Sequence, residues 1–237
     1  MMKRTIVVGA SSGIGAELVR QLVARGDRVA AVSRRLEKMQ QELPQDVLMF
    51  AHDVRDFDAI PGLFQEICHQ LGGLDCIIYS SGVMHKIEPG EFDFKKDHEM
   101  IEVNLSGAIA WLNQAAIRFQ NVGAGTIVAI GSVAGERGRQ AQPVYNASKA
   151  ALATYMEALR NRLCRHGVTV VTIKPGPTDT PMTAGFGFNR MMPVSVAASL
   201  ILKKMNRTGE YFLSPVHWLI FLIIRNIPSI ILRKLKI

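Results

Sequence analysis

Cysteine is scarce in this sequence, with three in 237 residues, and those three do not form a disulfide framework. Cys68, Cys76 and Cys164 are odd in number, and their spacings match neither paired bridges nor a zinc site. Reduced thiols without a nucleophilic role are typical of cytosolic proteins. A cleavable signal is also missing, because Met1-Met2-Lys3-Arg4 leads directly into a strand-like segment. We therefore expect a cytoplasmic protein.

Basic runs with interleaved aromatic residues are absent from the body of the chain, although the formal net charge is +8. Such a charge suits a nucleic acid, a membrane surface or an anionic cofactor. Without a basic-aromatic run or zinc-ligand spacing, we expect no nucleic-acid partner and no metal. The length fits one large domain, which we place at residues 1–214, followed by a separate tail at 215–237.

Apolar strand-like segments alternate with helical ones along the chain. The expected strands are short and nearly uniformly apolar, as strands covered on both faces should be. This alternation predicts an α/β fold built on a doubly wound parallel sheet. The expected strands are Thr5–Val8, Arg28–Ser33, Val47–Ala51, Cys76–Tyr79, Gly125–Ile130, Val168–Ile173 and Tyr211–Leu213. The expected helices are Ile14–Arg25, Lys96–Gln120 and Val144–His166.

A glycine-rich turn follows the first expected strand. Glycines allow a tight turn and close approach of a pyrophosphate, and the next helix offers free N–H groups to that anion. The alternative is a turn that only connects strand and helix, but its place after the first strand favours a cofactor site. The candidate residues are Gly9, Ser11, Ser12, Gly13, Ile14 and Gly15.

This Gly-x-x-x-Gly-x-Gly spacing resembles the first motif of the short-chain dehydrogenase/reductase family, although Val8 stands where that family usually has threonine. The resemblance implies a Rossmann-type three-layer sandwich that binds a nicotinamide dinucleotide. It extends over about residues 3–182.

The end of the second strand predicts which dinucleotide is bound. An NAD site usually has a carboxylate there, whereas this chain has Arg34 and Arg35. Guanidinium groups suit a 2′-phosphate, so NADP(H) is favoured over NAD(H). The alternative is that both arginines simply face water. By resemblance, Asp53 and Val54 after the third strand lie near the adenine.

Tyr145 and Lys149 lie four residues apart on an expected helix and therefore share one face. A lysine cation near a phenol lowers the phenol pKa and suits it to acid–base chemistry at a carbonyl. The motif is weak alone, because exposed helices often contain it. Ser132 at the end of a strand can hold the substrate oxygen, and Asn104 is either a surface residue or a hydrogen-bond relay.

The order Asn, Ser, Tyr-x-x-x-Lys matches the family pattern. By resemblance, Tyr145 is the acid/base, Ser132 and Tyr145 bind the substrate, Lys149 binds the nicotinamide ribose, and Asn104 holds a relay water. Gly82 retains backbone access to the cofactor, but Tyr79-Ser80-Ser81 replaces the amides that usually precede it. Resemblance also implies that cofactor-binding residues follow the sixth strand, and these are Pro175, Gly176 and Thr178.

The segment between Thr178 and Pro193 is expected to form a substrate lid. Its glycines provide mobility and its Met and Phe residues apolar contacts, which predicts an apolar substrate. The alternative is a hinge whose large residues pack on the core. The apolar residues in question are Pro181, Met182, Phe186, Phe188, Met191 and Met192.

The tail has a nearly continuous apolar run, Val216–Ile224, followed by Arg225 and a basic end, Arg233-Lys234-Leu235-Lys236. We expect attachment to a membrane surface, with a homo-oligomer interface as the second interpretation. A full span is the third, and it would bury Arg225 in the bilayer.

Together these features predict an NADP-dependent oxidoreductase that moves a hydride between the cofactor and a carbonyl or alcohol, CH–OH or C=O, on a small apolar substrate. The alternative hypothesis is a non-catalytic NADP(H)-binding sensor or interaction protein on the same fold. A homo-oligomer is expected in either case.

Overall fold

The computed structural model describes residues 2–234, and its centre is one sheet of seven parallel strands. The sheet order is β3-β2-β1-β4-β5-β6-β7, so the chain builds outward in both directions from β1 and β4. The strands are β1 (Arg4–Val8), β2 (Arg28–Ser33), β3 (Leu48–Ala51), β4 (Cys76–Tyr79), β5 (Gly125–Ile130), β6 (Val168–Lys174) and β7 (Gly209–Phe212).

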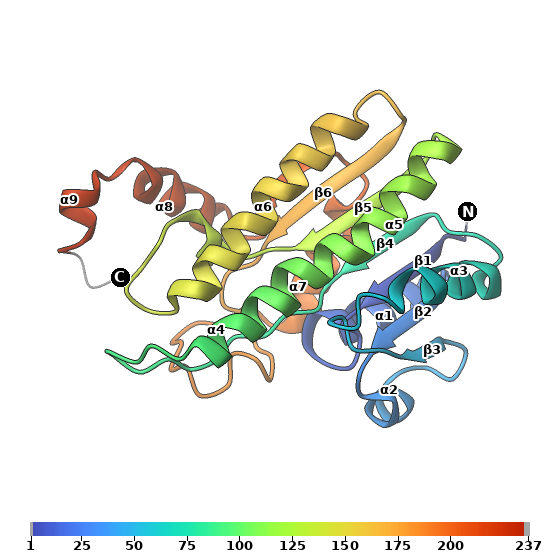
Figure 1. Cartoon of the computed structure of the whole chain (residues 1–237), viewed down its shortest axis with the longest axis horizontal. Coiled ribbons are helices and arrows are strands. Elements are labelled where there is room, and N and C mark those ends of the chain that lie inside the picture. The colour runs from blue at the N-terminus through green and yellow to red at the C-terminus, as the bar shows by residue number, and fades with distance from the viewer. Residues whose placement is uncertain (1, 235–237) are drawn as a thin grey trace.

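Helices cover both faces of the sheet, as Figure 1 shows. One buried cluster packs α3, α5 and α6 on one face, and a second packs α1, α2 and α7 on the other. The bounds are α1 (Gly13–Ala24), α2 (Leu36–Glu42), α3 (Ile60–Leu71), α4 (Phe94–Ile101), α5 (Gly107–Val122), α6 (Pro143–Leu163) and α7 (Val194–Lys204). This three-layer arrangement confirms the doubly wound, Rossmann-type fold that the alternation predicted.

The long helix expected over Lys96–Gln120 is wrong in one respect. The chain forms α4, then a π-helical turn over Glu102–Ser106 (η1), and then α5. π-turns widen the hydrogen-bond ladder and often occur at functional sites. The periodicity of apolar residues continues through such a turn, so sequence reasoning did not detect it. Helices α2, α3 and α7 were also not anticipated.

Tyr79 stabilises this π-helical turn. Its hydroxyl donates a 2.6 Å hydrogen bond to the carbonyl of Val103, and its side chain is fully buried. Gly107 leaves room for the phenol, since an added Cβ there would lie 2.7 Å from the Tyr79 oxygen. Tyr79 therefore satisfies a buried carbonyl in the irregular turn that contains Asn104.

The tail folds into α8 (Pro215–Asn226) and α9 (Ser229–Leu232), which lie at one end of the molecule in Figure 1. Arg225 faces the body of the protein, where it pairs with Glu136 and lies 3.4 Å from Glu210. Within residues 2–234, none of the helices combines the length and the apolar character that a bilayer crossing requires. Leu235 and Lys236, part of the expected basic end, lie outside the described residues.

Replacing Tyr79 with phenylalanine should destabilise the protein. The Val103 carbonyl would lose its partner in a buried site, at a cost of about 1–3 kcal/mol in the free energy of unfolding. Urea denaturation measures this loss. Tyr155→Phe is the matched control, because it removes an exposed hydroxyl that bonds Asn113 at 2.9 Å. Equal losses in the two variants would contradict the role given to Tyr79.

Candidate active site

One cleft runs along the carboxyl ends of the strands, where ligands of such sheets bind. It extends from the glycine turn after β1 to the start of α6, so residues far apart in the sequence line a single space. Most of the predicted site residues line it. They are Gly9, Ser11, Ser12, Gly13, Ile14, Arg34, Arg35, Asp53, Val54, Gly82, Ser132, Tyr145, Lys149, Pro175, Gly176 and Thr178.

The glycine turn leaves the first helix open to an anion. Gly9 and Gly13 have φ angles of 89° and 56°, which favour glycine. Ser12 at the N-cap of α1 makes no side-chain capping bond, so the first N–H groups of the helix have no side-chain acceptor there. Gly15 does not line the cleft. An added Cβ on Gly15 would lie 2.1 Å from the Gly9 carbonyl oxygen, so it permits close packing of the helix on the turn.

The two arginines after β2 have different surroundings. Arg34 lies 3.5 Å from the carboxylate of Asp53, which also binds Arg55 at 2.7 Å. Arg55 is the main reason why the pKa of Asp53 falls to about 2. Arg35 instead donates to the hydroxyls of Ser11 and Ser12, at 2.9 Å each. Among the described residues, no carboxylate is within ion-pair distance of Arg35, so its charge is available to an anion beside the glycine turn.

Tyr145 and Lys149 lie on the same face of α6 and are both buried. The Lys149 Nζ atom lies 5.9 Å from the centre of the Tyr145 ring and donates a 3.1 Å hydrogen bond to the carbonyl of Ile130. Burial lowers the pKa of Lys149 to about 8. An ammonium has three donors, so two remain for a ligand in the cleft.

The expected lowering of the Tyr145 pKa by Lys149 is not found. Burial dominates and raises the pKa of the phenol, while a hydrogen bond with Ser132 and the charge of Arg139 act in the opposite direction. The ammonium of Lys149 is directed to the Ile130 carbonyl, and burial disfavours its own charge. Tyr145 is therefore protonated at neutral pH, which suits a proton donor.

Ser132 is oriented by the backbone that follows it. Its hydroxyl oxygen accepts a 3.0 Å hydrogen bond from the Ala134 amide, at the start of the 3₁₀ turn Val133–Glu136 (η2). The hydroxyl proton therefore remains free to be donated, toward Tyr145 or toward a substrate oxygen in the cleft.

Asn104 lies behind the wall of the cleft and is fully buried. Its side-chain oxygen accepts from the Val83 amide at 2.7 Å, and its nitrogen donates to the Val83 carbonyl at 3.0 Å and to Ser148 at 3.1 Å. The π-helical turn thus brings Asn104 to the irregular segment that follows β4. This contact fixes the segment containing Gly82, where an added Cβ would lie 3.5 Å from Lys149 Nζ.

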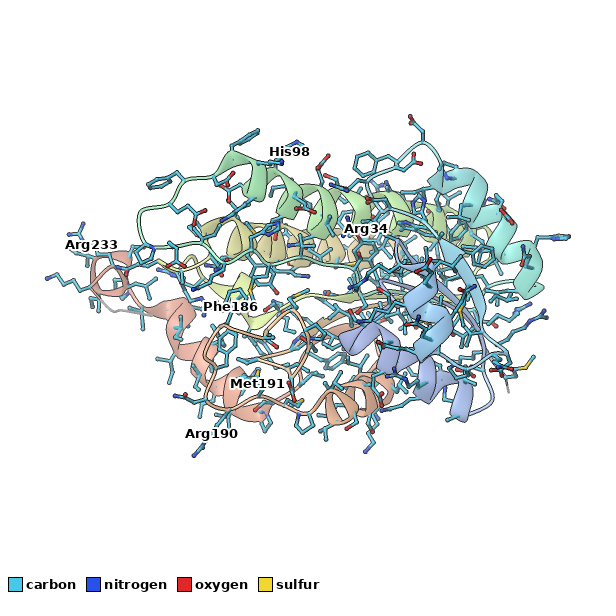
Figure 2. The ribbon with its side chains drawn as sticks, turned by 90° about the horizontal axis from the view of Figure 1, so that it is seen from below. Arg34, His98, Phe186, Arg190, Met191 and Arg233 are labelled. Carbon is cyan, nitrogen blue, oxygen red and sulfur yellow. The ribbon has the colours of Figure 1, made fainter. Side chains whose placement is uncertain are left out.

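Only part of the expected lid faces the cleft. Thr180, Pro181, Met182 and Thr183 line it. Phe186 and Phe188 instead stack on each other, with ring centroids 6.1 Å apart. Figure 2 shows Phe186, Arg190 and Met191 on this outer loop.

Met192 packs on the core and pairs with Thr178 in an isolated β-bridge. The apolar contacts expected from Phe186, Phe188, Met191 and Met192 are therefore wrong for the cleft in this structure.

Sequence reasoning missed several cleft residues. Ser33, His52, Ser80 and Ser81 line the cleft because they end or follow β2, β3 and β4. The rule that ligands bind at the carboxyl ends of parallel strands would have identified them. Arg139, whose charge acts on the Tyr145 pKa, lies in an irregular segment before α6 and had no such signal.

Comparisons with known proteins agree with this geometry. The family described as short chain dehydrogenase matches residues 3–189. An uncharacterized oxidoreductase of Staphylococcus epidermidis is 30% identical over 189 residues, which are 78% of this chain and 82% of that protein.

Two solved structures share the fold. A short chain dehydrogenase from Burkholderia cenocepacia in complex with NADP has a TM-score of 0.86 at 21% identity, covering 100% of this chain and 98% of its own. ElxO with NADP bound has a TM-score of 0.83 at 19% identity, covering 92% and 99%.

Lys149→Met should stabilise the protein near neutral pH. It removes a buried ammonium, and this gain in the free energy of unfolding outweighs the loss of the hydrogen bond to the Ile130 carbonyl. The lysine pKa is about 8 in the fold, against a model-compound value of 10.5. Between those values the unfolded chain binds more protons, so wild-type stability rises with pH while the variant lacks this gain. Thermal unfolding should therefore show a Tm advantage for Lys149→Met that shrinks as pH rises through this window.

The exposed Lys203→Met on α7 is the control and should show no such trend. A Tm difference between Lys149→Met and wild type that stays constant with pH would contradict the burial argument.

Proposed function

Because the chain belongs to the short-chain dehydrogenase family, we propose that it is an NADP(H)-dependent oxidoreductase that interconverts a carbonyl and an alcohol. The observation that carries this proposal is a protonated, buried Tyr145 beside Ser132 and Lys149 in the cleft that begins at the glycine turn. These groups provide a proton donor, an oxygen-orienting hydroxyl and a cation in one space.

The cleft fits a nicotinamide dinucleotide at both ends. At one end, the uncapped start of α1 would hold the pyrophosphate, and Arg35, which has no carboxylate partner among the described residues, would hold the 2′-phosphate. Asp53 and Val54 would border the adenine. At the other end, the free donors of Lys149 would hold the nicotinamide ribose, beside the turn that precedes Thr178.

The residues of the chain would then act on the substrate oxygen. Bound NADPH supplies a hydride to a carbonyl carbon, and bound NADP⁺ removes one from an alcohol. The Ser132 hydroxyl donates a hydrogen bond to the carbonyl oxygen and orients it. The Tyr145 phenol, which its raised pKa keeps protonated at neutral pH, gives its proton to that oxygen in the reducing direction. Relay of protons through a water at Asn104 stays a prediction.

The charge around Arg35 supports NADP(H) over NAD(H). Arg34 is partly neutralised by Asp53, whereas Arg35 faces two serine hydroxyls and no carboxylate among the described residues. A 2′-phosphate would supply the missing anion. Two proteins of similar fold have NADP bound, and this also supports the proposal.

We propose an apolar substrate. Val83, Ile130 and Met182 line the catalytic end of the cleft and provide its apolar surface. Such a substrate partitions into lipid, so we also propose a cytoplasmic enzyme that works at a membrane surface through its tail. The division into a catalytic domain at 1–214 and a tail at 215–237 belongs to this proposal. The homo-oligomer stays a prediction.

The alternative hypothesis, a non-catalytic NADP(H) sensor or interaction protein, depended on the altered segment Tyr79–Gly82. The structure explains a tyrosine at position 79, because its hydroxyl donates a hydrogen bond to the carbonyl of Val103. The departure from the family pattern therefore gives that alternative no support.

Tyr145→Phe should reduce the rate of NADPH-dependent carbonyl reduction by about 10²–10⁴-fold, because it removes the proton donor. NADPH binding, measured by fluorescence, should change little. Tyr155→Phe lies on the same helix with its hydroxyl on Asn113 and should retain activity. Equal rates for Tyr145→Phe and wild type would end the catalytic proposal.

Arg35→Gln should raise the KM for NADPH by about 10–100-fold, the value of charge-assisted hydrogen bonds to a phosphate. The KM for NADH should be unaffected, because that cofactor lacks the 2′-phosphate. Arg20→Gln is the control, since Arg20 pairs with Glu17 and Glu42 on the surface. The NADP(H) assignment fails if Arg35→Gln raises both KM values by the same factor.

A further inference from the structure

Apolar side chains cover the outward side of α8 and continue onto α9. α8 directs Phe221 toward the body, where its ring stacks on Phe212 with centroids 6.4 Å apart. Eight other apolar side chains of α8 and α9 are between 42% and 61% exposed. We call these the tail surface: Val216, Trp218, Leu219, Ile220, Leu222, Ile223, Ile230 and Ile231. Exposed apolar patches of this kind mark interaction sites.

The tail surface is held in place by contacts to the body. Arg137 donates to the carbonyls of Arg225 and Ile227, at 3.1 and 2.8 Å, and to the Ser229 hydroxyl at 3.2 Å. Arg225 pairs with Glu136, whose side chain is fully buried and also pairs with Lys174. The helix is therefore folded onto the protein and presents its apolar side in a fixed direction.

Charge indicates what covers this surface. After Glu210 the sequence has no Asp or Glu and four Lys or Arg residues. Arg233 and Lys234 are exposed, and Figure 2 shows Arg233 at the outer end of the tail, pointing away from the body. An apolar helix with a half-exposed tryptophan and cations at its end suits the interface of an anionic bilayer.

The helix that carries most of the tail surface also packs against the wall of the cleft. His217 of α8 packs against Gly176 in the cleft wall, so closely that an added Cβ on Gly176 would lie 2.0 Å from the His217 ring. Gly176 directly follows Lys174-Pro175, and Lys174 pairs with Glu136. The helix that carries the apolar side chains is thus part of the support of the cleft.

We propose that the tail surface docks on an anionic phospholipid bilayer and presents the cleft to an apolar carbonyl substrate dissolved in the lipid. The docking itself depends only on the exposed side chains and charges of the tail. The delivery of substrate rests on the proposed function.

Vesicle flotation of the full chain tests the docking. Wild type should float with vesicles that contain phosphatidylglycerol and less with pure phosphatidylcholine. Leu219→Ser/Ile223→Ser should weaken binding by at least about tenfold, because it places hydroxyls on the apolar side of the helix. Arg233→Glu/Lys234→Glu should remove the preference for anionic lipid. Trp218 reports insertion by a blue shift of its fluorescence, since Trp111, the other tryptophan, is buried.

Val122→Ser/Val196→Ser is the matched control, because these valines are 66% and 45% exposed on α5 and α7, away from the tail. It should bind vesicles like wild type. Equal flotation of wild type and the Leu219/Ile223 variant overturns the proposal, as does no flotation at all. If wild type forms an oligomer and does not bind vesicles, and the Leu219/Ile223 variant no longer forms that oligomer, the surface is a subunit contact and the proposal is overturned.

A water-soluble carbonyl assayed without vesicles separates this proposal from the proposed function. Activity there without flotation overturns only the docking. Flotation without reduction of any carbonyl supports the docking and overturns the catalytic proposal with the substrate delivery that rests on it. Reduction of an apolar ketone that rises with anionic vesicles in wild type, and not in Leu219→Ser/Ile223→Ser, supports both.

Discussion

The burial of Lys149 is the constraint on which the rest of the site depends. Its ammonium has no carboxylate within ion-pair distance among the described residues, and only the Ile130 carbonyl compensates it. Burial therefore lowers its pKa to about 8 and leaves donors directed at the cleft. Such a charge is unfavourable for stability, and its presence is understandable only if a ligand uses it. Burial also raises the pKa of Tyr145 and keeps it protonated, so the same apolar environment sets the protonation of both groups.

The supporting framework is irregular where the site needs it. A π-helical turn brings Asn104 against Val83. The Tyr79 hydroxyl donates a hydrogen bond to the Val103 carbonyl, which this turn leaves buried. At the far end, Arg137 and Glu136 join the tail to the turn after Ser132. The edge of the sheet that borders the cleft is consequently tied to the helix that carries much of the exposed apolar surface.

Much of this arrangement could be predicted from the sequence, because the signals were local. Uniformly apolar segments bounded by glycines identified the strands, and β2, β4 and β5 begin and end where expected. Tyr145 and Lys149 followed from helical spacing. The π-helical turn, the inward direction of Arg225 and the different partners of Arg34 and Arg35 could not be predicted, since each depends on long-range contacts. The Tyr145 pKa was misjudged because burial outweighs the lysine charge, and burial is a property of the fold.

The central claim is that this cleft transfers a hydride to a carbonyl while the chain supplies the proton. The most direct measurement is mass spectrometry of the products formed from apolar ketones and NADPH that carries deuterium at its reactive position. The account predicts a single deuterium on the former carbonyl carbon of at least one product, with an exchangeable proton from solvent on its oxygen. Tight binding of the labelled NADPH with no deuterium in any product would contradict it.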